Sequence, residues 1–267
     1  MDAMRHSLVD IGANLTHDSF DDDRDEVVAR ARDAGVDVFV LTGSTEAGSR
    51  HALELAGSAP DIYRSTAGVH PHHASEYNNA VDATLRELLE DPLVSAVGEC
   101  GLDYFRNFSP VEAQRDAFQR QLSIAADVQK PVFLHQRGAH DDFVEILTPF
   151  VDRIPDGVAH CFTGTGEMLD AYLELGLYIG ITGWICDERR GTHLREIIDR
   201  IPADRLMIET DAPYLLPRTL RPKPKSRRNE PAHLVEVLRV VAEARSETEA
   251  ELAAQTTANA RRFFRLD

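Results

Sequence analysis

The stretch Val97-Gly98-Glu99-Cys100-Gly101-Leu102-Asp103 guides the interpretation of the whole sequence. The apolar run Leu93–Val97 predicts a buried strand, and Glu99 is the first acid after it. A single carboxylate at a strand end is usually a solvated loop charge. Glu99 therefore becomes informative only if other strands end in the same way.

Three other apolar runs also end on potential metal ligands: Pro131-Val-Phe-Leu-His135, Gly157-Val-Ala-His160 and Leu206-Met-Ile-Glu209-Thr210-Asp211. In a parallel barrel the carboxyl ends of all strands lie on one face, where the site is built. Each residue alone is more often structural, but their repetition favours a shared function. The residues predicted to form one metal site are Glu99, His135, His160 and Asp211.

Eight apolar runs alternate with helical patterns along the chain, which indicates βαβ units and a parallel sheet. The predicted strands are 7–12, 36–41, 63–69, 93–97, 131–135, 157–160, 177–182 and 205–209. Helices are predicted up to Ala34, where Gly35 ends the helix, and over Pro110–Val128. A hydroxyl in Thr42–Thr45 is expected to cap another helix. Eight units suggest a (β/α)8 TIM-type barrel, and an open doubly wound sheet is the alternative.

Composition fits one large domain covering residues 1–267, since 43% of the residues are hydrophobic. The net charge of -16 argues against a protein that binds nucleic acid over its whole surface with Lys and Arg. Three widely spaced cysteines favour reduced thiols, and the N-terminus lacks the apolar core of a signal peptide. We expect a cytoplasmic monomer without a membrane-spanning segment.

The predicted ligands suit a hard or borderline cation such as Mg²⁺, Mn²⁺ or Zn²⁺. Glu99 can bridge two ions or hold one, and the histidines bind as neutral imidazoles. Asp211 can ligate the ion and also orient or deprotonate an attacking water. His70, after the third predicted strand, is a further ligand, a donor to a substrate phosphate or a histidine held in a rigid turn. His72 and His73 are expected to face solvent.

The segment after the eighth predicted strand is the clearest charge anomaly of this acidic chain. Residues 218–228 contain no acid and six basic residues: Arg218, Arg221, Lys223, Lys225, Arg227 and Arg228. Such a segment attracts a polyanion, or else it neutralises nearby acids. Arg137 and the pair Arg189–Arg190 are further candidates for phosphate contacts. Three aromatic residues on predicted loops can stack unpaired bases or pack internally: Phe105, Phe108 and Trp184.

Several stretches closely resemble the TatD-type metal-dependent hydrolases. They are Asp10–Thr16, Ser65–His72, Val97–Asp103, Ala159–Thr165, Tyr178–Gly191, Ile208–Pro217 and Ser226–His233. The resemblance covers nearly the whole chain and implies a (β/α)8 barrel with a divalent metal. It also implies a Mg-dependent 3′→5′ exonuclease acting on single-stranded DNA and RNA.

The resemblance carries the metal positions onto Glu99, His135, His160 and Asp211. It makes His70 an active-site histidine, so the catalytic assignments are Asp211, Glu99 and His70. The predicted substrate-binding residues are His70, Arg137, Arg227 and Arg228. Most relatives carry a His-x-His pair after the first strand, where this chain has Gly12 and Asn14. We therefore expect one well-occupied ion and a second that binds weakly.

Two other functions remain open on the sequence. One keeps the metal but hydrolyses an amide or ester, as in the wider amidohydrolase group. Many such enzymes bridge their metals with a carboxylated lysine after the fourth strand, where this chain has Glu99. The other is a barrel that binds nucleic acid without cleaving it.

Overall fold

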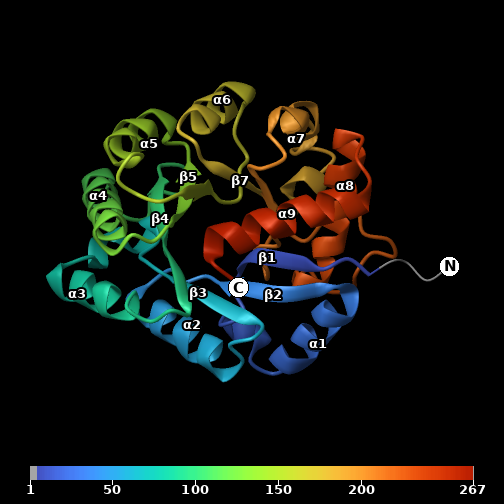
Figure 1. Ribbon diagram of the computed structural model, residues 1–267, viewed down its shortest axis with the longest axis horizontal. Coiled ribbons are helices and arrows are strands. Elements are labelled where there is room, and N and C mark those ends of the chain that lie inside the picture. The colour runs from blue at the N-terminus through green and yellow to red at the C-terminus, as the bar shows by residue number, and fades with distance from the viewer. Residues whose placement is uncertain (1–4, 267) are drawn as a thin grey trace. The chain divides into compact units, whose positions relative to one another are not determined.

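In the computed structural model, helices and strands alternate along residues 5–266, the part of the chain that the structure describes (Figure 1). Its eight strands are β1 (Leu8–Ala13), β2 (Val36–Leu41), β3 (Tyr63–Ala67), β4 (Val94–Asp103), β5 (Val132–Arg137), β6 (Gly157–Ala159), β7 (Tyr178–Ile181) and β8 (Leu206–Ile208). The α-helices of the same residues are α1 (Arg24–Ala34), α2 (Glu46–Ser58), α3 (Asn79–Leu88), α4 (Val111–Val128), α5 (His140–Leu147), α6 (Gly166–Glu174), α7 (Thr192–Ile197), α8 (Leu234–Arg245) and α9 (Glu249–Phe264).

The strands form one sheet in the order β1 to β8. Strand β1 also bonds to the segment that follows β8. The Asn14 N–H donates to the Ala212 carbonyl at 2.8 Å, and the Asp211 N–H donates to the Gly12 carbonyl at 2.8 Å. This is the strand order of a (β/α)8 TIM-type barrel, so that prediction is confirmed and the open doubly wound alternative is wrong.

The chain divides into two compact units. The first unit comprises the described residues up to Val40, Cys161–Gly166 and the residues from Ile179 onward. The second unit comprises Leu41–His160 and Glu167–Tyr178. Strands β3 to β6 with α2 to α5 therefore lie in the second unit, whereas β1, β8, α8 and α9 lie in the first.

Local sequence signals place several helix ends as predicted. Helix α1 ends at Gly35, whose φ of 105° is a left-handed conformation that glycine adopts without strain. The Thr45 hydroxyl caps α2 by accepting the Gly48 N–H at 2.9 Å. Helix α4 begins at Val111, so Pro110 is its cap residue and not its first helical residue.

Strands β4 and β5 run further than the sequence predicts. Strand β4 continues through Asp103 and β5 through Arg137, so Glu99 and His135 lie within strands and not at their ends. The reason is that β4 and β5 stay paired over this polar stretch, with Asp103 opposite Arg137. The apolar runs alone therefore predict strands β4 and β5 to be shorter than they are.

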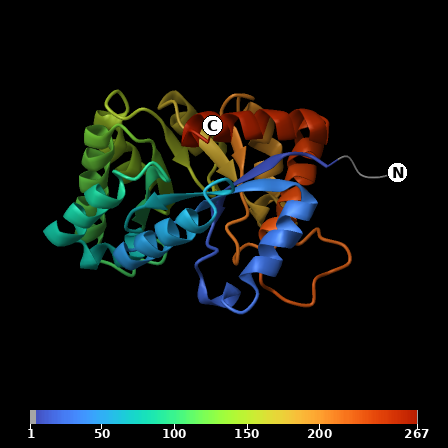
Figure 2. The same cartoon turned by 60° about the horizontal axis from the view of Figure 1, so that its bottom comes forward.

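The C-terminal helix α9 ties β1 and β8 together inside the first unit (Figures 1 and 2). The buried Asn259 donates its amide to the carbonyls of Ala203 and Leu206, both at 2.8 Å. The Thr257 hydroxyl donates to the Ser7 carbonyl at 2.7 Å. These side chains bond to backbone carbonyls near the amino ends of the two strands, and the buried Leu206 carbonyl would otherwise be costly to leave unpaired.

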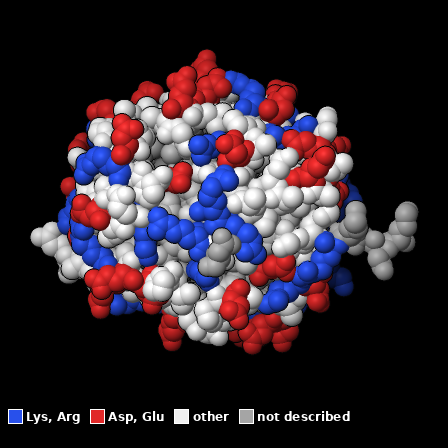
Figure 3. Space-filling view, viewed as in Figure 1, with Lys and Arg blue, Asp and Glu red and all other residues white. Residues whose placement is uncertain are grey.

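Acidic side chains occur along the whole outline of the face drawn in Figure 3, with basic ones among them, in keeping with the net charge of -16. Across residues 5–266, no helix has the length and hydropathy needed to cross a bilayer.

We predict that Gly101→Ala will strongly destabilise the fold. Gly101 has a φ of +144°, and an added Cβ would lie 1.9 Å from the His135 carbonyl oxygen. Backbone clash and strain together should lower the free energy of unfolding by about 3 kcal/mol or more. Urea unfolding followed by circular dichroism measures the change.

Gly57→Ala is the matched control, because Gly57 lies in α2 and nothing stands within 4 Å of its added Cβ. That variant should be neutral or more stable by up to about 1 kcal/mol, the difference in helix propensity between the two residues. Equal stability of the two variants would contradict the prediction.

Candidate metal centre

Glu99 lies at a β-bulge in β4. Val97 and Cys100 are three residues apart, but their partners on β5 are only two residues apart, so β4 carries one extra residue. Gly98, with a φ of +139°, supplies the left-handed conformation that this irregularity requires. The Glu99 N–H donates to the Gly43 carbonyl at 2.7 Å, which fixes the bulge. Bulges re-aim side chains in this way next to active sites.

Three imidazoles converge on one oxygen of Glu99. His135 Nδ1 lies 2.9 Å from Glu99 Oε1, His160 Nε2 lies 3.1 Å from it and His70 Nε2 lies 3.3 Å from it. His135 comes from β5, whereas His160 directly follows β6 and His70 follows β3. The second unit thus brings together four residues that the sequence assigned to the site, from four consecutive strands.

The electrostatics of this group keep Glu99 ionised. Burial by itself raises the pKa of the Glu99 carboxyl, but the charges and hydrogen bonds of His70, His160 and His135 hold that pKa well below its usual range. Burial lowers the pKa of His70 to about 4, against the opposing attraction of Glu99. A neutral His70 adds no positive charge beside the Glu99 carboxylate, which favours binding of a cation there.

His70 carries its proton on the nitrogen that faces Glu99. Its Nδ1 accepts the His72 N–H at 3.1 Å, so in the neutral ring the proton is assigned to Nε2. In that tautomer Nε2 donates a hydrogen bond and does not ligate a metal. The tautomer therefore favours His70 as a donor, one of the three roles considered on the sequence.

The donor set fits a divalent cation. One possible ligand atom each from His70, Glu99 and His135 lie within 4.8 Å of one another, and with His70 acting as a donor the ligands of this group are Glu99 and His135. His135 Nε2 is buried, and Asp103 Oδ2 lies 3.5 Å from it, at the outer limit of hydrogen-bond distance. A buried ring nitrogen with only this long contact, close to two carboxylates, is suited to a metal bond.

Asp211 belongs to the first unit and follows β8, so its role as a metal ligand stays a prediction. It adopts a left-handed conformation with a φ of 54°, and its N–H donates to the Gly12 carbonyl. The Asn14 amide donates to Asp211 Oδ1 at 3.1 Å and to the Ala212 carbonyl at 3.2 Å. Asn14 thus orients the Asp211 carboxylate.

Glu209 is fully buried in the same unit. Its Oε1 accepts the N–H of Cys161, the residue after His160, at 2.5 Å. Glu209 therefore fixes the backbone next to a candidate ligand, and the structure gives it a positioning contact.

Asp103 is a functional candidate that the sequence analysis missed. It is 1% exposed, its Oδ2 lies 2.8 Å from His72 Nε2, and its Oδ1 accepts the Arg106 N–H at 2.8 Å. Burial raises the pKa of the Asp103 carboxyl, but its contacts with His135, the Arg106 N–H and His72 hold that pKa below its usual value. His72 is consequently half-buried and not solvent-facing, which corrects that expectation. The two-residue spacing of Glu99, Gly101 and Asp103 is the signal that could have found Asp103.

The three arginines predicted to contact phosphate have different surroundings in the structure. Arg137 lies in β5 with its guanidinium 4.0 Å from the centre of the Phe105 ring. Arg228, in the long segment that Figure 2 shows looping out beside α1, pairs with Asp23 at 2.6 Å and with Glu230 at 3.0 Å. Arg227 is exposed. Arg228 thus has a structural role that the sequence did not reveal, whereas Arg227 presents its charge to solvent.

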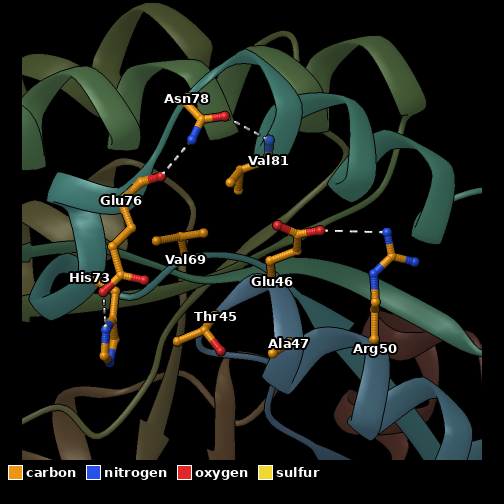
Figure 4. A pocket seen from close by; sticks show the side chains of 9 residues that line it. All are labelled: Thr45, Glu46, Ala47, Arg50, Val69, His73, Glu76, Asn78 and Val81. Atoms are coloured by element: carbon orange, nitrogen blue, oxygen red, sulfur yellow. Dashed lines mark hydrogen bonds and ion pairs between the residues drawn. The ribbon is translucent and has the colours of Figure 1, made fainter.

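A pocket of about 620 Å³ lies elsewhere in the second unit (Figure 4). Its charged lining residues pair with one another, since Arg50 lies 3.5 Å from Glu46 and His73 lies 3.2 Å from Glu76. Glu99 and the two histidines of β5 and β6 do not line it. This pocket is therefore separate from the metal group and carries no net attraction for an anion.

The chain is similar in sequence to a family of known proteins. The model of the family described as "TatD related DNase" matches residues 9–265. A protein of Erwinia tasmaniensis named "3'-5' ssDNA/RNA exonuclease TatD" is 55% identical over 259 residues, which cover 97% of this chain and 100% of that protein.

Two solved structures have the same fold with lower sequence identity. The TatD family hydrolase of Entamoeba histolytica has a TM-score of 0.88 at 26% identity and covers 99% of this chain and all of its own. The Escherichia coli TatD homolog YJJV has a TM-score of 0.88 at 28% identity and covers 98% of this chain and 99% of its own. With a family model that spans nearly the whole chain and relatives at this identity, the chain belongs to the TatD related DNase family.

Proposed function

We propose that this chain is a metal-dependent 3′→5′ exonuclease that hydrolyses phosphodiester bonds in single-stranded DNA and RNA. The observation that carries the proposal is the convergence of His70, His135 and His160 on Glu99. The name of the Erwinia relative supports the direction of cleavage and the substrate. Its alignment covers 97% of this chain and all of that protein, so the proposal concerns the whole activity.

The proposed metal ligands are Glu99, His135, His160 and Asp211. When bound, a divalent ion lowers the pKa of its water and neutralises charge on a phosphate oxygen. Glu99 supplies a buried negative charge for that ion. The rings of His135, in β5, and His160, directly after β6, both approach Glu99 Oε1. These side chains therefore need to move little to bind the ion.

His70 and Asp211 are the proposed groups for proton handling. His70 is neutral at pH 7 and donates from Nε2, so it would hydrogen-bond a phosphate oxygen without repelling the ion. Asp211 would accept a proton from the attacking water through its carboxylate, which Asn14 holds in one orientation. A base oriented before substrate binds reduces the reorganisation required for reaction.

The position of Lys130 does not support the alternative function, metal-dependent hydrolysis of an amide or ester with a bridging lysine. Lys130 lies before β5, and its Nζ donates to the Asp91 carbonyl at 2.9 Å and to the Val94 carbonyl at 2.5 Å. Both acceptors are at the amino end of β4, away from Glu99 along that strand. The lysine that bridges metals in many amidohydrolases has no counterpart there.

We further propose Mg²⁺ as the physiological ion, with Mn²⁺ and Zn²⁺ as competitors. Carboxylate and imidazole donors bind all three, and cellular availability favours Mg²⁺. We also propose that the protein is a cytoplasmic monomer with one TatD-type domain. The match of one family model over residues 9–265 supports a single domain, and three free cysteines suit a reducing compartment.

The first test is degradation of single-stranded DNA labelled at its 5′ end. With Mg²⁺ the strand should shorten progressively from its 3′ end, and EDTA should stop the reaction. Glu99→Ala should lower the rate by at least about 100-fold, since loss of a group that only supports a ligand already costs 10- to 100-fold. Glu76→Ala, an exposed acid of the separate pocket, is the control. Undiminished cleavage by the Glu99 variant would refute the metal assignment.

The second test is calorimetric titration of the protein with Mn²⁺. One tight site is expected, together with a second, much weaker one, because Gly12 offers no ligand and the Asn14 amide is engaged with Asp211. Glu99→Gln should abolish the tight site, whereas Glu76→Gln should leave it unchanged. Two equally tight sites in the free protein would contradict this expectation.

The third test separates the two arginines of the segment after β8. Arg227→Ala should raise KM for single-stranded DNA and flatten its salt dependence, with stability unchanged to within about 0.5 kcal/mol. Arg228→Ala should in addition lower the free energy of unfolding by about 1 kcal/mol, since it breaks partly exposed pairs with Asp23 and Glu230. Steady-state kinetics at several salt concentrations and urea unfolding provide the readouts. An unchanged salt slope in both variants would assign this segment to solvated surface.

A further inference from the structure

The loop that follows β4 exposes two aromatic side chains. Phe105 and Phe108 are each 66% exposed. Removing a phenylalanine side chain from water is favourable, so proteins usually bury it. Two such side chains on one short loop, left largely in water, therefore mark a binding surface if the loop is held in place.

Buried polar contacts do hold this loop in place. Gln114, from α4, is fully buried and accepts the Asp103 N–H at 2.8 Å, and its amide donates to the Ser109 carbonyl at 2.8 Å. The Ser109 hydroxyl donates to the His72 carbonyl at 2.9 Å and accepts the Ser75 N–H at 3.1 Å. The loop is thus fixed at both ends, and the exposure of its phenylalanines is part of its ordered structure.

Phe108 is connected to the metal group through a row of rings. The Phe108 and His72 ring centres are 4.7 Å apart, and the His72 and His70 ring centres are 4.2 Å apart. His70 in turn faces Glu99 at 3.3 Å, and Asp103 holds His72. Two histidine rings, those of His72 and His70, therefore connect the exposed ring of Phe108 to the buried carboxylate within the same unit.

The guanidinium of Arg137 is stacked over the ring of Phe105. The Arg137 guanidinium lies 4.0 Å from the centre of that ring, within the distance for a cation–π contact. Gly138, with a φ of +68°, lies close to the backbone of Phe105, since an added Cβ would be 3.3 Å from the Phe105 nitrogen. A planar cation stacked on an aromatic ring offers a flat surface for a base and a charge for a phosphate.

We propose that Phe108 and the Phe105–Arg137 pair form a stacking platform for the bases of the single strand beside the bond to be cleaved. The inference rests on the proposed exonuclease function and names how that site recognises its substrate. Stacking on aromatic rings tolerates every base, because each has a π face. Bases in a duplex are already stacked on each other, so the platform selects for single strands. Trp184 lies in the first unit with Arg190 over its ring and is not part of the platform.

The test compares binding of two strands under conditions without cleavage. A fluorescent oligothymidylate and an abasic strand of equal length are titrated with protein in EDTA, and anisotropy gives each Kd. Phe108→Ala should weaken binding of the oligothymidylate by about 10-fold, within the range measured for base–aromatic stacking. Binding of the abasic strand should change by less than about 2-fold. Phe105→Ala should act in the same direction.

Two variants serve as controls. Phe108→Trp keeps a stacking ring and should retain the affinity of the parent protein. Val235→Ala removes another exposed apolar side chain, 36% exposed on α8, and should leave both affinities unchanged. Both phenylalanines are exposed, so the variants should keep their thermal midpoints, which circular dichroism checks.

The outcomes separate the platform from the proposed function. Equal weakening of both strands by Phe108→Ala, or no weakening of either, would overturn the platform even if the parent protein cleaves DNA. Loss of selective binding in the variants, together with a parent protein that lacks nuclease activity, would support the platform and refute the exonuclease. A change in oligomeric state with unchanged affinity for both strands would instead identify the phenylalanines as a protein interface and overturn the proposal.

Discussion

A buried carboxylate surrounded by imidazoles is the constraint on which the second unit depends. Glu99 is 7% exposed, and burying an unpaired carboxylate costs far more than a single contact returns. Its Oε1 lies within 3.3 Å of nitrogens from His70, His135 and His160. Those three residues come from strands on different sides of β4 in the sheet order. The group is therefore complete only when β3 to β6 are in register.

Much of this group was predictable from the sequence, because βα alternation and strand-end ligands follow local patterns. Glu99, His135 and His160 were identified from where apolar runs stop. The bulge at Glu99 was not predictable, since it depends on the pairing of β4 with β5 and on the backbone of Gly98. The same pairing extends β4 to Asp103, which made that residue a buried partner of His72.

Contacts between distant parts of the chain account for the other differences. The local cluster of basic residues predicts that Arg228 contacts phosphate. In the structure Arg228 pairs with Asp23, which lies 205 residues earlier in the chain. No local pattern reveals such a pair. Asn14 was noted only as a departure from the family, and its contact with Asp211 spans 197 residues. Composition and periodicity predict the helices and strands. The role of each polar side chain depends on its tertiary contacts, which these patterns do not reveal.

The ties between α9 and the strands β1 and β8 have a consequence for biosynthesis. Strand β1 emerges from the ribosome early, but the side chains of Thr257 and Asn259 that hold it beside β8 are translated near the end. The second unit is built mainly from the continuous segment Leu41–His160, so its strands can pair while translation continues. The amino-terminal segment must meanwhile wait with apolar surface uncovered. Vectorial synthesis thus leaves β1 without its partners on the β8 side until the last part of the chain has been made.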